Sequence, residues 1–232
     1  MSDDLKRQMV EELNQIIDSR EKEVGRVYPQ VRNAYLTPYE WPELDTLRHE
    51  VCIALTFGLH QAALTLTNHM LESFLKFSVS YKEAFESYKA SEDRGLDAML
   101  ASLAPSFERN DGKDMGNTIN RACTLGLIEK HHKKQLHEFR ESFRNAYSHA
   151  ERRKIHGEVA TPVQSIHLSD SGEFVVEGKQ SRRIVDMPFA HGLAQYEHAK
   201  ANALPYFLYV DALVRHTKPI VFPNSTPQDP AA

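Results

Sequence analysis

Cysteine, long apolar runs and the common catalytic fingerprints are scarce or missing in this chain of 232 residues. Its two cysteines, Cys52 and Cys123, each lie in an apolar stretch of helical character, which fits buried reduced thiols better than a disulfide. No apolar run approaches the roughly 20 residues of a membrane-spanning helix, and residues 1–6 lack the apolar core of a signal peptide. These absences predict a cytoplasmic protein with no membrane partner.

The usual signatures of nucleotide, metal and serine chemistry are also missing. The chain has no Walker loop, no Rossmann glycine fingerprint and no G-x-S-x-G of a serine hydrolase. His131, His132 and His137 invite a metal interpretation, but neither H-E-x-x-H nor a cysteine cluster accompanies them. The sequence therefore predicts that no metal and no cofactor is used.

Charge is unevenly distributed along a chain of formal net charge −4. Residues 128–154 hold eight Lys and Arg against four Glu, together with four of the twelve histidines. A local basic patch on an acidic protein indicates contact with a polyanion at one site, although a solvated helix face would have the same composition. The cations of this patch are Lys130, Lys133, Lys134, Arg140, Arg144, Arg152, Arg153 and Lys154.

Apolar residues at helical spacing predict a mainly helical chain. The pattern indicates an amphipathic helix over 4–25, a connector over 27–42 and two helices over 43–81, which form either a hairpin or one kinked helix at Gly58. A short helix stopped by Pro105 follows, and then a turn over 111–114 and a helix that ends near Gly126. Residues 129–150 form the next helix, with a core stripe at Leu136, Phe139, Phe143, Ala146 and Ala150.

The composition changes after Lys154. Two alternating runs, 165–168 and 173–176, surround a turn and predict a β-hairpin. Helical character returns over about 191–217, where Pro205 should kink or split the segment. We expect an all-α bundle in one domain over 1–222, with a core at about 44–150, a hairpin insertion at about 155–190 before the C-terminal helix, and a disordered tail over 223–232.

The segment Arg144-Asn145 followed by His149 closes the helix predicted over 129–150. RNA cleavage without a metal needs a cation for the phosphate, a hydrogen-bonding group and an imidazole that moves protons near neutral pH. At about 100° per residue Arg144 and His149 lie roughly 140° apart around an α-helix, whereas Arg144 and Ser148 share a face. One copy thus supplies part of a site, and a composite site across a two-fold axis is plausible. The alternative is ion pairing near a helix C-terminus, where cations are favoured.

Three features resemble the HEPN domain (higher eukaryotes and prokaryotes nucleotide-binding), an all-helical family with many metal-independent endoribonucleases. The first is Arg144-Asn145 with His149, which matches the family's R-x4-6-H motif and its preferred polar residue after the arginine. The second is the helical pair that runs from Glu50 to Lys76, and the third is the entry Leu125-Gly126-Leu127-Ile128 into the motif helix. Together they span about residues 44–150. Glu151 departs from members that carry a tyrosine two residues after the histidine and pair with a nucleotidyltransferase antitoxin.

The resemblance implies an endoribonuclease that cleaves single-stranded RNA or tRNA as a homodimer, in a toxin–antitoxin or anti-phage setting with an antitoxin or regulatory protein. Arg144, Asn145 and His149 are then the catalytic residues, and Ser148 and Glu72 support them. Glu72 either anchors Arg144, polarises His149 or faces solvent. A catalytically inactive HEPN module that binds a nucleotide or a protein is the alternative. Candidate contacts to the RNA backbone are Lys133, Lys134, Arg140, Arg152, Arg153 and Lys154.

Overall fold

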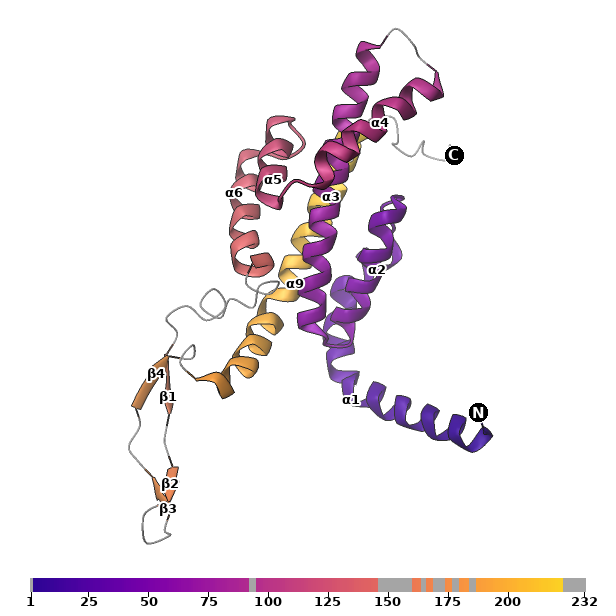
Figure 1. Cartoon of the computed structure of the whole chain (residues 1–232). Helices are drawn as coiled ribbons and strands as arrows, with labels where there is room; N and C mark the ends of the chain where they lie inside the picture. The colour runs from indigo at the N-terminus through magenta and orange to yellow at the C-terminus, as the bar shows by residue number, and fades with distance from the viewer. Residues whose placement is uncertain are drawn as a thin grey trace.

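Long helices dominate the computed structural model, which describes residues 2–91, 95–145, 160–163, 166–168, 174–176, 180–183 and 187–222 (Figure 1). The helices are α1 (Asp3–Leu36), α2 (Pro42–Thr56), α3 (His60–Ala90), α4 (Leu96–Asp111), α5 (Met115–Thr124), α6 (Lys130–Phe139) and α9 (Pro188–Val221). A π-helical segment, η1 (Arg140–Asn145), follows α6 directly. The predicted all-α fold class is confirmed. None of the described helices has an apolar stretch long enough to cross a membrane.

Helix α3 runs through the centre of the molecule and packs against α2, α4 and α9 (Figure 1). Its apolar face is fully buried at Leu71 and Phe74, and α9 contributes Phe207 and Val210 to the same core. Gly58 separates α2 from α3 with a φ of +71°, a backbone conformation that glycine adopts without a steric penalty. The two helices form a hairpin, so the first of the two predicted alternatives is confirmed.

The predicted connector over 27–42 is wrong, because α1 continues to Leu36 through Pro29. Val27, Val31 and Ala34 recur at i, i+4 and i+7 and are buried, so packing against α2 outweighs the lost backbone hydrogen bond of the proline. Helix α1 changes direction between its free end and the part beside α2 (Figure 1). Proline is a common cause of such bends, and Pro29 with Gly25, four residues before it, lies in this helix.

Two other prolines were also expected to interrupt helices. Pro105 lies inside α4 and Pro205 inside α9, so the predicted stop at 105 and a split at 205 are wrong. A helical proline leaves the carbonyl four residues earlier without its partner. Those residues are Ala101 and Ala201, and both are exposed, so water can bind their carbonyl groups.

Among the described residues before α9, four short strands are present. Strand β2 (Ile166–Leu168) pairs with β3 (Phe174–Val176) in antiparallel register, which confirms the predicted hairpin. A second antiparallel pair, β1 (Ala160–Val163) with β4 (Gln180–Arg183), was not predicted. Both pairs lie away from the helices (Figure 1). The predicted tail over 223–232 lies outside the described residues.

A network of polar groups joins the segment 37–41 to α2 and α9. The hydroxyl of Tyr39 donates to Asp211 Oδ1 over 2.6 Å, and Arg215 donates to the same carboxylate over 2.9 and 3.1 Å. Asp45 accepts the backbone N–H groups of Tyr39 and Trp41 over 2.7 and 3.0 Å, which holds the segment that enters α2. These bonds place the start of α2 against α9 and thereby hold the α2–α3 hairpin in the bundle.

Candidate site around Arg144

The helix that carries the motif changes geometry before it reaches Arg144. Residues 130–139 are α-helical as predicted, but residues 140–145 form the π-helix η1 with i→i+5 hydrogen bonds and a wider turn. The predicted spacing of 100° per residue therefore does not hold over Arg140–Asn145. Single π-turns inside α-helices are frequent at functional sites.

Aromatic packing holds this segment on α9. Phe139 and Phe143 stack with ring centroids 5.5 Å apart, and both contact Tyr206 of α9 at 4.9 and 4.8 Å. Tyr206 in turn donates its hydroxyl to Asn68 Oδ1 of α3 over 2.9 Å. The apolar side of η1 is thus anchored to two core helices, and this positions the next residue, Arg144.

Arg144 reaches from η1 to α3. Its Nη2 lies 3.7 Å from Glu72 Oε2, and the other oxygen of Glu72 lies 3.2 Å from Lys76 Nζ. The Arg144 side chain is 31% exposed and that of Glu72 is 24% exposed, so water and ligands can reach this ion pair. Of the three roles predicted for Glu72, the structure contains the ion pair with Arg144, whereas a contact with His149 would lie outside the described residues.

The other predicted site residues divide into two groups. Asn145 ends η1 beside Arg144, whereas Ser148, His149, Arg152, Arg153 and Lys154 lie outside the described residues, as do Ala146 and Ala150 of the predicted core stripe.

Lys134 is exposed on α6 and Lys133 is half-buried. Arg140 pairs with Glu141 over 2.7 Å, and its guanidinium fills the space that a side chain at Gly116 would need.

Two histidines of the basic patch have polar partners on other helices. His132 Nδ1 lies 2.6 Å from the hydroxyl of Tyr209 in α9, and His137 Nε2 lies 3.2 Å from Asn120 Oδ1 in α5. Burial lowers the pKa of both imidazoles and raises the pKa of Tyr209 to about 12. The imidazoles of His132 and His137 are therefore neutral near pH 7, and they connect α6 to α9 and α5. In the described ranges, no group of three or more His, Cys, Asp or Glu is placed to hold a metal ion.

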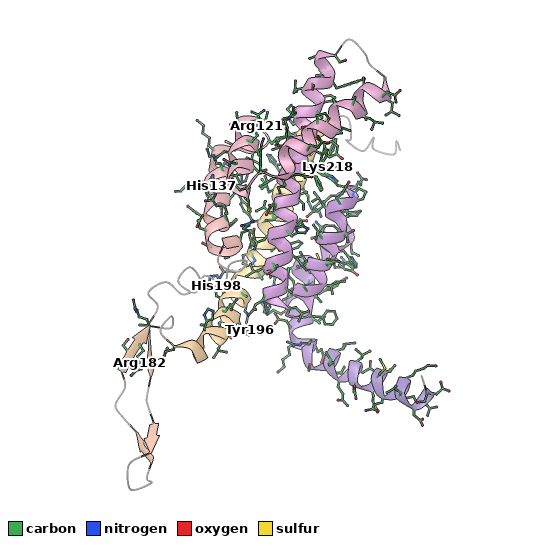
Figure 2. The ribbon with its side chains drawn as sticks, viewed as in Figure 1. Arg121, His137, Arg182, Tyr196, His198 and Lys218 are labelled. Carbon is green, nitrogen blue, oxygen red and sulfur yellow. The ribbon has the colours of Figure 1, made fainter. Side chains whose placement is uncertain are left out.

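Sequence reasoning missed a second polar cluster, centred on Glu83 of α3. Arg121 reaches from α5 and donates to Glu83 Oε1 over 2.7 Å (Figure 2), while Asn110 of α4 donates to Oε2 over 3.1 Å. Burial opposes ionisation of Glu83, but the hydrogen bonds from Arg121 and Asn110 outweigh it and lower the pKa of the carboxyl. The cluster lines a shallow depression that also includes Arg109 and Lys113. Because Glu83 neutralises part of the charge of these arginines and Lys113, we interpret the Glu83 cluster as a structural junction of α3, α4 and α5.

Comparisons with known proteins leave the chain without a match. No family model, no curated protein and no solved structure matches it. The candidate site is therefore defined by its own features: the π-helical turn, the aromatic anchor on α9 and the Arg144–Glu72 ion pair.

Proposed function

We propose that the chain is a metal-independent endoribonuclease that cleaves single-stranded RNA or tRNA in the cytoplasm as a homodimer. The observation that carries the proposal is the Arg144–Glu72 ion pair, which holds a guanidinium at the surface beside Lys76. An arginine in this setting can bind a phosphate through its planar fork, while Glu72 and Lys76 limit the orientations that it samples. By resemblance to HEPN proteins, an antitoxin or another regulatory protein restrains the activity.

The chemistry assigns one role to each motif residue. One His149 imidazole takes the proton from the ribose 2′-hydroxyl, whose oxygen attacks the neighbouring phosphorus, and the other His149 of the dimer protonates the departing 5′-oxygen. Arg144 binds the non-bridging oxygens, where negative charge grows in the transition state. Asn145 orients His149 or a phosphate oxygen. The products are a 2′,3′-cyclic phosphate and a free 5′-hydroxyl, and no metal is required.

A cleavage assay tests the proposal directly. Purified protein is incubated with labelled single-stranded RNA and tRNA in EDTA, beside the variants His149→Ala and Arg144→Ala. We expect 2′,3′-cyclic ends from the wild type and a loss of at least about 100-fold in each variant, because His149→Ala removes general acid–base catalysis and Arg144→Ala removes a donor to the developing negative charge. His131→Ala is the matched control, because His131 is an exposed histidine of α6 outside the motif. No cleavage by the wild type, with or without a candidate regulator, would favour the inactive binding module instead.

Mixing wild-type chains with His149→Ala chains tests the composite site. In a site that takes one imidazole from each copy, a mixed dimer has only one of the two and is inactive. Because a quarter of the dimers in an equal mixture are wild type, we expect about a quarter of the wild-type rate. A mixture that keeps half of the wild-type rate while the variant remains dimeric would place the catalytic residues of each site in one chain.

A further inference from the structure

The amino-terminal part of α1 carries an apolar face that the rest of the chain does not cover. Each side chain of this face is between 45% and 57% exposed, and the segment runs away from the other helices (Figure 1). Its members, which we call the exposed α1 face, are Leu5, Met9, Val10, Leu13, Ile16 and Ile17.

This face continues the buried side of the same helix. At about 100° per residue, Met9, Leu13 and Ile16 have the same angular positions as the buried residues of the last turns. Those residues, Val27, Val31 and Ala34, are no more than 3% exposed against the bundle. The core-facing stripe of α1 thus extends beyond the bundle for several turns. Apolar patches of this kind mark interaction sites.

We propose that the exposed α1 face pairs with the same face of a second copy of this chain, as an antiparallel two-helix coiled coil. The repeat is a heptad with Lys6, Leu13 and Arg20 at one core position and Met9, Ile16 and Glu23 at the other. The proposal does not depend on the ribonuclease activity, because it uses none of the residues around Arg144.

Charge complementarity selects the antiparallel orientation. In a parallel pair in register, each core residue meets its own copy, so that Lys6 meets Lys6, Arg20 meets Arg20 and Glu23 meets Glu23. An antiparallel pair with Leu13 opposite Ile16 avoids these like-charge contacts. Lys6 lies opposite Glu23, which also pairs with Arg26 and His60 of its own chain, and the aliphatic stem of Arg20 lies on Met9. The same alignment brings Val10 to Ile17 on the flank. Met9, Val10, Leu13, Ile16 and Ile17 then each have an apolar neighbour, whereas Leu5 lies on the opposite flank of the pair.

Area and charge also favour a second copy over a membrane surface. Residues 3–24 make a helix about 33 Å long, and two such helices in contact along one face bury on the order of 1,000 Å², the lower limit of a specific interface. Residues 3–26 carry seven acidic and five basic side chains. Helices that lie on anionic membranes instead have a polar face rich in Lys and Arg.

Sedimentation analysis of the full chain over a concentration series tests the pairing. We expect Leu13→Lys/Ile16→Lys to have half the mass of the wild type, because it places four charges in the central layers. Gln8→Lys/Gln15→Lys adds the same charge on the outer face and should keep the wild-type mass. Helical content by circular dichroism should be equal in all three proteins, because the substituted side chains are exposed. A monomeric wild type, or a Leu13→Lys/Ile16→Lys protein with the wild-type mass, would overturn the proposal.

Discussion

Removal of the Tyr39 hydroxyl tests the network that joins α2 to α9. In Tyr39→Phe the ring keeps its volume, so that no cavity forms, and Asp211 keeps both hydrogen bonds from Arg215. What is lost is the 2.6 Å bond from the hydroxyl to a carboxylate that is 8% exposed. Burial, followed by the charge of Asp211, raises the pKa of Tyr39, so the hydroxyl is protonated and donates at every pH of interest.

The expected loss follows from the type of bond. A hydrogen bond to a charged group contributes about 1.5–3 kcal/mol to stability. Because Arg215 still compensates the carboxylate, we expect the free energy of unfolding to fall by about 2 kcal/mol, with a decrease in melting temperature of about 4–8 °C for a chain of this size.

Urea unfolding followed by tryptophan fluorescence measures this loss. Trp41 is the one tryptophan of the chain, and it lies against Phe222 and Tyr81 with ring centroids 5.2 and 5.8 Å apart. Its emission therefore reports on the same junction. Tyr28→Phe removes a hydroxyl from a half-buried ring of α1 and is the matched control. A loss for Tyr39→Phe of less than about 0.5 kcal/mol, within the range of ordinary surface substitutions, would refute the idea that this bond holds the junction.

Three further outcomes are expected. Burial lowers the folded-state pKa of His60, His132, His137 and His198, so the unfolded chain binds more protons below about pH 6.5. Stability should be full above that pH and fall below it, by up to about 1.4 kcal/mol per pH unit for each histidine, and His60→Gln should reduce this slope in urea unfolding at a series of pH values. In a thermal melt, Gly58→Ala should lower the free energy of unfolding by about 1–2 kcal/mol, because φ is +71° and the new Cβ would lie 3.2 Å from Glu23 Cγ. In the same measurement Gly112→Ala, with open space around the new Cβ, should leave stability unchanged or raise it. Glu83→Gln should lower the free energy of unfolding by about 1–3 kcal/mol, because Arg121 loses a charged partner. Glu86→Gln, at an exposed ion pair, should change the free energy of unfolding by less than about 1 kcal/mol. Equal losses in the two variants would contradict a structural role for Glu83.

Local periodicity was enough to predict most of the helices. Buried residues on α2 and α3 recur at helical spacing around Gly58, and the alternation in β2 and β3 identified the hairpin. Prolines misled the prediction at 29, 105 and 205, because a helix can continue past a proline where water binds the freed carbonyl or where packing outweighs the lost hydrogen bond. The β1–β4 pair gave no signal, since Pro162 and the polar run over 180–183 do not alternate.

The candidate site was only partly predictable, for a different reason. Glu72 stood out as an acid in an apolar helix, but whether it meets Arg144 depends on how two helices distant in sequence cross. The Glu83 cluster combines residues of three helices, and no sequence period connects them. The π-turn also left no trace, because the spacing from Leu136 through Phe139 to Phe143 fits an α-helix equally well.

The π-helical turn η1 also sets the phase of the chain that follows it. A π-turn accommodates one more residue than the same span of α-helix, so deletion of a single residue between 140 and 142 would restore a regular α-helix and leave the later side chains in phase. Phe143 would then still face Tyr206, and Arg144 would still face Glu72. If the full sequence were instead wound as regular α-helix, the extra residue would rotate Phe143 and Arg144 by about 100° relative to α3 and α9. The π-turn thus absorbs one residue and keeps Arg144 directed at Glu72.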